Sequence, residues 1–286
     1  MRGIIAVTLK DLLVHVDDSR QCPARLDATV TLTAAHDAHL VGIYVVAQPR
    51  LPTHIRAQIP DDLLLAQQKR EDESVARVRA AFEDAVRRAG VNGEWRSVDG
   101  SALPTLALHG RYVDLLVVGQ RDPSGETGAD DPSIPDHLIL SAGRPALVIP
   151  YTGQFPVVGE RVMVAWDASR LAARAVNDAL PLMARAKSVV VLAVNPVVRD
   201  DERGHGDIPC ADICLHLARH GIRAEAQQIY ADDLDVGEML LSRAADQGID
   251  LMVCGAYGHA RWREVVLGGV TRHLLAHMTL PVLMSH

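Results

Sequence analysis

Aromatic residues are scarce in this 286-residue sequence: they make up 3% of it, whereas hydrophobic residues as a whole make up 48%. Its apolar cores must therefore be built mainly from Val, Leu, Ile and Ala, a composition typical of parallel sheets. Charged residues reach 23%, which excludes a disordered chain at this apolar content. The length is sufficient for two domains of ordinary size, each with its own core.

An excess of positive charge and long apolar runs are also missing. The formal net charge is −7, which provides no electrostatic attraction to nucleic acid or to an anionic membrane. No apolar run approaches the roughly 18 to 20 residues that cross a bilayer, and the N-terminus lacks the basic, apolar and small-residue series of a signal peptide. We therefore expect a cytoplasmic protein that binds neither nucleic acid nor membrane.

Cysteine is sparse, and its spacing is too uneven for the disulfide framework of a secreted domain. Cys210 and Cys214 stand one helical turn apart, with His205, Asp207 and His216 nearby, so a metal site is conceivable there. The alternative, two small apolar side chains in the buried stripe of a helix, fits the pattern better. We expect reduced thiols and no metal centre.

An internal repeat organises the chain. Short apolar segments, each of a length suited to a buried strand, recur in the second half of the chain in the same order as in the first. The downstream segments match at an ungapped offset of 136 residues, which carries Gly119 onto Gly255. The matched segments are 113–119 (VDLLVVG) with 249–255 (IDLMVCG), 144–150 with 280–286, 12–17 (LLVHVD) with 162–167 (VMVAWD), and 41–46 with 190–195.

Helical periodicity follows these strand-like segments in both halves. Such alternation, with apolar rather than alternating strands, indicates parallel βαβ units with helices on both faces of a sheet. We predict an α/β fold of two tandem doubly wound domains, each with a five-stranded parallel sheet. The predicted helices include 25–39 and 74–89 in the first half and 171–186 and 208–220 in the second.

The two halves are joined by a segment rich in turn-forming residues. Residues 151–160 contain Gly153, Pro156 and Gly159, which is typical of a linker. We therefore place the domains at residues 1–155, called copy one, and 156–286, called copy two. Copy one carries extra residues over 49–72.

The segment after the fourth strand of copy two is the most informative. Residues 255–271 read GAYGHARWREVVLGGVT. Two residues separate Gly255 from Gly258, and nine residues separate Gly258 from Gly268. Glycines there are explained either as turn residues or as points where backbone approaches a phosphate at the start of a helix. On the second interpretation the phosphates would meet the free N–H groups of Gly269, Val270 and Thr271, and the Thr271 hydroxyl.

This spacing resembles that of the universal stress protein family, whose nucleotide-binding members carry two, then nine, residues between three glycines, and then Ser or Thr. A first strand ending in Asp167 and a closing strand over 280–284 strengthen the resemblance, which covers both copies. It implies a tandem member, with two five-stranded parallel sheets packed about a pseudo-twofold axis, that binds ATP, alone or with Mg²⁺.

The resemblance also implies a set of site residues. Gly269 stands where the family commonly has Ser or Thr, so one hydroxyl contact to the phosphates would be lost. The implied contacts are Asp167 and the backbone near Val194 with adenine, Gly255 and Ala256 with ribose, and Gly258, His259, Gly268, Gly269 and Thr271 with the phosphates, next to the N–H of Val270.

Copy one lacks the features that would hold a phosphate. Proline has no N–H to donate, and an aspartate at a glycine position adds bulk and negative charge. Asp17 remains at the end of the first strand, either as a remnant of a site or as a cap of the following helix. At the offset of 136 residues, Gly258 corresponds to Asp122, Gly268 to Pro132, Gly269 to Ser133 and Thr271 to Pro135.

Three functions are compatible with these patterns. The one favoured is a stress-response regulatory protein that binds ATP in copy two and acts through nucleotide-dependent association, as a homo-oligomer or with a partner protein, rather than through catalysis. A second is a slow ATPase or phosphoryl-transfer enzyme, with Asp167 holding a metal through water and Arg261, Arg263 and Arg272 neutralising charge. A third is an interaction protein that binds no nucleotide.

Overall fold

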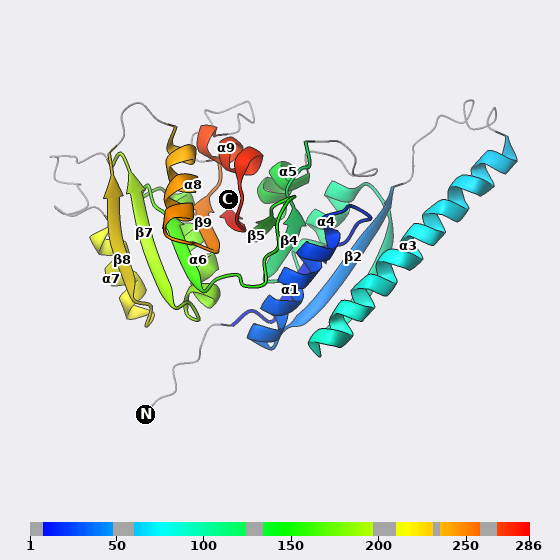
Figure 1. Ribbon diagram of the computed structural model, residues 1–286, viewed down its shortest axis with the longest axis horizontal. Coiled ribbons are helices and arrows are strands. Elements are labelled where there is room, and N and C mark those ends of the chain that lie inside the picture. The colour runs from blue at the N-terminus through cyan, green and yellow to red at the C-terminus, as the bar shows by residue number, and fades with distance from the viewer. Residues whose placement is uncertain (1–7, 48–59, 124–133, 197–209, 231–234, 258–267) are drawn as a thin grey trace.

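A single mixed sheet runs through the whole molecule. The computed structural model describes residues 8–47, 60–123, 134–196, 210–230, 235–257 and 268–286. Ten strands among them form one sheet in the order β3-β2-β1-β4-β5-β10-β9-β6-β7-β8, with the C-terminus close to where the two halves meet (Figure 1). Each half has the strand order of a doubly wound fold, so the predicted α/β architecture of two tandem domains is confirmed.

The elements alternate between strand and helix in both copies. In copy one they are β1 (Asp11–His15), α1 (Cys22–His36), β2 (His39–Ala47), α3 (Asp61–Ala89), β3 (Asn92–Gly100), α4 (Ala102–Gly110), β4 (Leu115–Gly119), α5 (Ile134–Ser141) and β5 (Ala146–Ile149). In copy two they are β6 (Arg161–Ala165), α6 (Arg170–Met183), β7 (Ser188–Val194), α7 (Ala211–Arg219), β8 (Ala224–Ile229), α8 (Val236–Asp246), β9 (Leu251–Gly255), α9 (Gly269–His277) and β10 (Val282–Ser285).

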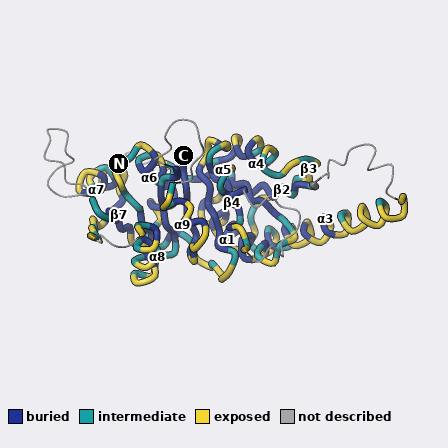
Figure 2. The backbone as a smooth tube through the Cα atoms, turned by 90° about the horizontal axis from the view of Figure 1, so that it is seen from above, coloured by how far each residue is buried: buried dark blue, intermediate teal, exposed yellow. Residues whose placement is uncertain are grey.

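One predicted helix is much longer than expected. The pattern predicts a helix over 74–89, but α3 begins at Asp61, inside the segment noted as extra. Figure 2 shows this helix extending beyond the body of the molecule, with its first half exposed. No apolar stripe marks that half, because the first side chain that α3 buries is Ser74, and apolar periodicity detects only the part of a helix that packs against a core.

Two layers of helices cover the sheet. One apolar cluster joins one face of the sheet to α1, α3, α6 and α7, and a second joins the opposite face to α4, α5, α8 and α9. Each layer thus takes two helices from each copy, so the buried strands pack against helices on both faces, as the continuous apolar runs predict.

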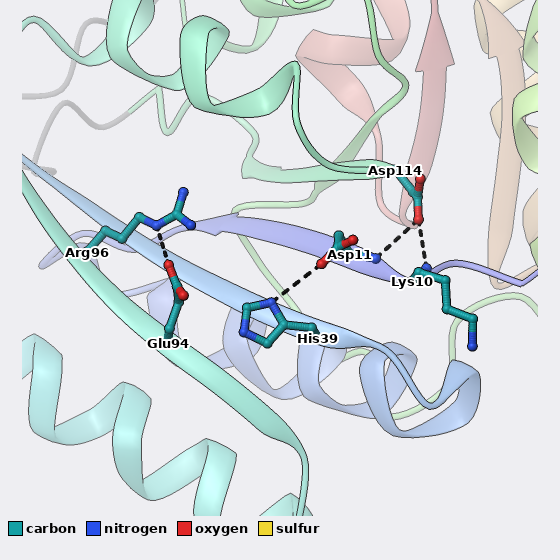
Figure 3. A network of polar contacts seen from close by, with 6 residues as sticks. All are labelled: Lys10, Asp11, His39, Glu94, Arg96 and Asp114. Carbon is teal, nitrogen blue, oxygen red and sulfur yellow. Dashed lines mark hydrogen bonds and ion pairs between the residues drawn. The ribbon is translucent and has the colours of Figure 1, made fainter.

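The aspartate of the repeated strand motif is a structural residue. The Asp114 carboxylate accepts hydrogen bonds from the backbone N–H groups of Lys10 (2.7 Å) and Asp11 (3.1 Å), and the Asp11 carboxylate lies 3.5 Å from Nδ1 of His39 (Figure 3). The repeat partner, Asp250, accepts in the same way from Gly159 and Arg161. These bonds fix the amino-terminal ends of the strands and leave the opposite edge of the sheet for function.

The two copies join edge to edge. β5 and β10 pair antiparallel, whereas every other strand pair is parallel. Nearby, the buried Gln120 donates to the Leu275 carbonyl (2.9 Å) and accepts from the Tyr151 N–H (3.1 Å).

Within the described ranges, no helix is both long and apolar enough to cross a membrane.

Candidate functional site

A cavity of about 200 Å³ opens at the carboxyl ends of the strands of copy two. It lies where β6 has β7 on one side and β9 on the other, which is the point in a doubly wound sheet where the strand order reverses. Chain connections leave a crevice at that point, and ligands of open α/β sheets bind there. The cavity is therefore in the place that the fold itself assigns to a site.

One wall of this cavity is apolar. Leu192 and Val194 come from β7, and Val236 and Leu240 come from α8. Of these four residues, only Val194 was predicted from the sequence, because the other three have the pattern of ordinary core residues. The spacing of Val236 and Leu240, one helical turn apart, was the available signal for a shared face.

The opposite wall is the start of α9. Gly268 is the N-cap of this helix, and Gly268, Gly269, Val270 and Thr271 all line the cavity. The first N–H groups of a helix have no intrahelical partner, and with the helix dipole they favour a negative charge. Among the described residues, and apart from its chain neighbours, a Cβ at Gly268 would have no heavy atom closer than 3.8 Å, and one at Gly269 would have none within 4 Å. The described part of the chain therefore leaves space beside the backbone at these two positions.

Thr271 links the start of α9 to the end of β9. Its hydroxyl is buried and accepts a hydrogen bond from the Tyr257 N–H at 3.2 Å. A hydroxyl can accept and donate at the same time, so this bond is compatible with the predicted donation to a phosphate. Tyr257 itself was not anticipated, because a single tyrosine after a strand carries no motif.

Asp167 lies at the rim of the cavity, just after β6. Its carboxylate accepts from the Ser169 N–H at 2.9 Å, and the Ser169 side chain accepts from the Ala172 N–H at 3.1 Å as the N-cap of α6. The turn and the cap fix the direction in which β6 passes into α6. The Asp167 side chain remains exposed beside the apolar wall.

The two predicted ribose contacts have different surroundings. Gly255 lines the cavity, but a Cβ there would lie 2.6 Å from the Ala172 nitrogen and from the Leu171 carbonyl carbon. The close approach of α6 thus requires that position 255 has no Cβ, whether or not a ligand binds. Ala256 is fully buried, and its N–H donates to the Ser285 carbonyl of β10. The cavity lining does not include Ala256.

Two predicted phosphate contacts, Gly258 and His259, lie outside the described residues.

Cys254 also lines the cavity, and burial together with the charge of Asp167 raises the pKa of its thiol to about 12. The thiol is therefore protonated at neutral pH. In the described part of the chain, no group of three or more His, Cys, Asp or Glu side chains is arranged to hold a metal ion.

At the corresponding edge of copy one, a buried arginine takes the space beside Gly119, while a cavity of about 230 Å³ is lined by Asp17 together with residues of β2 and α3. The Arg25 guanidinium lies 2.6 Å from the Asp17 carboxylate, and the arginine side chain is only 3% exposed. A Cβ at Gly119, the repeat partner of Gly255, would lie 2.2 Å from a guanidinium nitrogen of Arg25. Burial raises the pKa of Asp17, but the charges of Arg25 and His15 outweigh it and hold the pKa well below its usual range. Asp17 thus forms a buried ion pair.

Comparison with known proteins agrees with this architecture. A universal stress protein from Archaeoglobus fulgidus aligns with 96% of this chain and 97% of its own, with a TM-score of 0.72 at 14% identity. A universal stress protein from Pseudomonas aeruginosa, so described provisionally, covers 97% of this chain and 93% of its own, with a TM-score of 0.59 at 15% identity. At these identities the likeness shows the fold.

Sequence comparison identifies the family. A universal stress protein of Synechocystis, Slr1230, is 26% identical over 179 residues, which are 59% of this chain and 57% of that relative. The match therefore spans little more than half the length of this curated relative. The model of the universal stress protein family matches twice, over residues 8–150 and 159–286. The chain belongs to the universal stress protein family, with one family domain in each half.

Proposed function

We propose that copy two binds ATP in the cavity at the ends of β6, β7 and β9. The observation that carries the proposal is that an apolar wall and the start of α9 face the same cavity. An apolar slot takes up a planar base, and a helix N-terminus attracts a phosphate. A nucleotide has both groups in one molecule.

Asp167 provides a polar contact at the base end of the site. An ionised carboxylate only accepts hydrogen bonds, and adenine carries an exocyclic amino group that can donate one. Asp167 at the rim of the apolar wall would accept from that amino group, and the proposal of adenine as the base follows the family resemblance.

The phosphate end is bound by backbone rather than by side chains. Gly268, Gly269 and Val270 bring N–H groups to the cavity wall, and Thr271 adds a hydroxyl. Because each added phosphate brings more negative charge to the helix N-terminus, affinity should increase from AMP to ADP to ATP. Mg²⁺ would accompany the phosphates of ATP.

We place ATP in a regulatory role. A ligand shifts a protein between states in proportion to its differential affinity for them, and here ATP would favour one state of association of the chain with itself or with a partner protein. The same preparation tests the alternative of a slow ATPase, because release of inorganic phosphate would be detected.

The test is a calorimetric titration with ATP and Mg²⁺. Wild-type protein should bind one nucleotide per chain, and Gly268→Val should bind none. The valine side chain would not clash with the described residues, so the variant should fold, but the side chain would obstruct the approach of a phosphate to the cavity wall. Asp167→Asn should bind about tenfold more weakly, because a charged acceptor is lost. Its matched control in copy one, Asp17→Asn, should bind like the wild type.

Two sites per chain would contradict the assignment to copy two alone. No binding at millimolar ATP would contradict nucleotide binding altogether and would favour the interaction protein. AMP and ADP titrated in parallel check the role given to the helix N-terminus, and GTP checks the preference for adenine.

A further inference from the structure

Tyr257 reaches out of copy two into copy one. It directly follows the Gly255–Ala256 pair at the end of β9, and it is only 4% exposed. Its hydroxyl donates toward the backbone carbonyl and a carboxylate oxygen of Asp136, each at 3.2 Å. Asp136 lies in the first turn of α5. A residue that is bonded to the cavity-lining Thr271 is therefore held by a helix of copy one.

The backbone of Tyr257 connects this contact to the cavity. Its N–H donates to the Thr271 hydroxyl at 3.2 Å, and Thr271 is in the first turn of α9, whose N–H groups face the cavity. A continuous series of hydrogen bonds thus runs from Asp136 through Tyr257 to Thr271. A shift of α5 or of the tyrosine would move the start of α9.

Tyr257 holds a backbone conformation that a side chain disfavours. Its φ is +67°, in the left-handed region that is sterically unfavourable for residues other than glycine. Glycine would adopt this conformation without that steric cost. The ring and the hydroxyl must therefore contribute something that glycine lacks, and their contact with Asp136 is the contribution that the structure shows.

The surroundings of Asp136 suit a fixed acceptor. Burial raises the pKa of the Asp136 carboxyl, while the Tyr257 hydroxyl and the charges of His137, Arg121 and Arg272 oppose the rise. Of these cations, Arg272 lies on α9 itself. Asp136 thus accepts a hydrogen bond from Tyr257 and attracts α9 through the charge of Arg272.

The contact runs in one direction only. At the repeat offset of 136 residues, Tyr257 corresponds to Arg121 and Asp136 to Arg272. The reverse contact would place two arginines together, and like charges repel. Copy one, whose own sequence is unsuited to phosphate, therefore supplies the acceptor that fixes the site of copy two.

We propose that Tyr257 and Asp136 are a positioning pair for nucleotide binding: α5 of copy one holds Tyr257, and through Thr271 the start of α9, in the geometry that presents N–H groups to the phosphates. The inference rests on the proposed function. It makes the site of copy two incomplete without copy one.

The test is a double-mutant cycle on the dissociation constant for ATP. Tyr257→Phe removes only the hydroxyl, and it should weaken binding about five- to tenfold at an unchanged one site per chain. Asp136→Ala should also weaken binding. The double variant should bind ATP with no lower affinity than the single variant that has the lower affinity. Tyr112→Phe, at a tyrosine that is 77% exposed, controls for loss of a hydroxyl.

A second control separates positioning from a merely looser junction. Arg174 donates to the Gly143 carbonyl across the two copies, away from the cavity lining. Arg174→Ala should leave the dissociation constant unchanged. The inference is overturned if Tyr257→Phe binds ATP like the wild type, or if Arg174→Ala weakens binding equally. In that case wild-type binding and its loss in Gly268→Val would still support the proposed function, whereas failure of the wild type to bind would overturn both.

Discussion

At the end of the first strand, the aspartate of copy one pairs with an arginine of α1, whereas the aspartate of copy two borders a cavity that reaches the first turn of α9. Asp17 and Asp167 are 150 residues apart and follow the first strand of each copy. Asp17 is 14% exposed and is paired with Arg25, whereas Asp167 is exposed at the rim of the cavity. At the same offset, Ala175 stands where Arg25 stands.

This difference shows how a duplicated fold can lose a site and keep its shape. A long side chain from α1 occupies the space beside Gly119 at the end of β4 in copy one, and an alanine at the same place in α6 stands beside the cavity of copy two. The sheet order and the two layers of helices are the same in both copies. The capacity to bind is therefore a property of a few side chains and not of the fold.

The largest effect is expected from removing the occupant of copy one. Arg25→Ala leaves the Asp17 carboxylate buried without its cation, so the free energy of unfolding should fall by about 3 to 5 kcal/mol. Urea denaturation at neutral pH measures it. Adding Asp17→Asn to this variant should recover part of the loss. A loss below about 1 kcal/mol would mean that the pair contributes little.

A second difference between the copies should appear as pH dependence. His36 ends α1, where copy two has Ala186, and burial with the charges of Arg185 and Lys10 lowers its pKa from 6.5 to about 4. The unfolded chain then binds a proton that the folded chain does not. Stability should be full above pH 6.5 and should fall toward pH 4, by at most about 1.4 kcal/mol per pH unit.

The variant His36→Leu isolates this contribution. Urea denaturation at pH 7, 6 and 5 should give a smaller loss of stability in His36→Leu than in the wild type. Equal slopes for the two proteins would contradict the assignment to His36.

The paired glycines at the ends of β4 and β9 sharpen the comparison further. A Cβ in Gly255→Ala would meet backbone atoms of α6 at 2.6 Å, whereas one in Gly119→Ala would overlap the buried Arg25 guanidinium that pairs with Asp17. Gly255→Ala should cost about 1 to 3 kcal/mol, and Gly119→Ala, which displaces Arg25, should cost at least as much. Thermal unfolding of the two variants compares them, and a Gly119→Ala variant as stable as the wild type would refute the position described for Arg25.

The smallest effect concerns the first helix of each copy. Ser169 caps α6 through its side chain, whereas Gln21 makes no side-chain cap bond to α1. Ser169→Ala should lower the free energy of unfolding by about 1 kcal/mol, and Gln21→Ala should change it by less than about 0.5 kcal/mol. Chemical denaturation measures both, and similar values for the two would remove this distinction.

Local patterns in the sequence predicted most of the fold. Apolar runs such as 113–119 and their repeats located the strands because buried parallel strands are apolar on both faces. The pattern underestimated α3, whose first half buries nothing. It also left open how the two sheets meet, since the antiparallel pairing of β5 with β10 depends on contacts between copies.

The candidate site was predictable only where local sequence determines it. The glycines that precede α9 are visible as a motif, and the structure places Gly268 and Gly269 on the cavity wall. Arg25 and Tyr257 were not predicted. Each acts through a partner distant in sequence or in a neighbouring element, Asp17 for the first and Asp136 for the second, and no short-range pattern reports such a contact.

The measurement that tests the central claim most directly is hydrogen exchange of the whole chain with and without ATP and Mg²⁺. Binding in copy two alone should slow exchange at the ends of β6, β7 and β9 and in the first turn of α9, and should leave the ends of β1 and β2 unchanged. Protection at Asp17 and the end of β2 equal to that at Asp167 and Val194, or no protection in copy two, would contradict the claim.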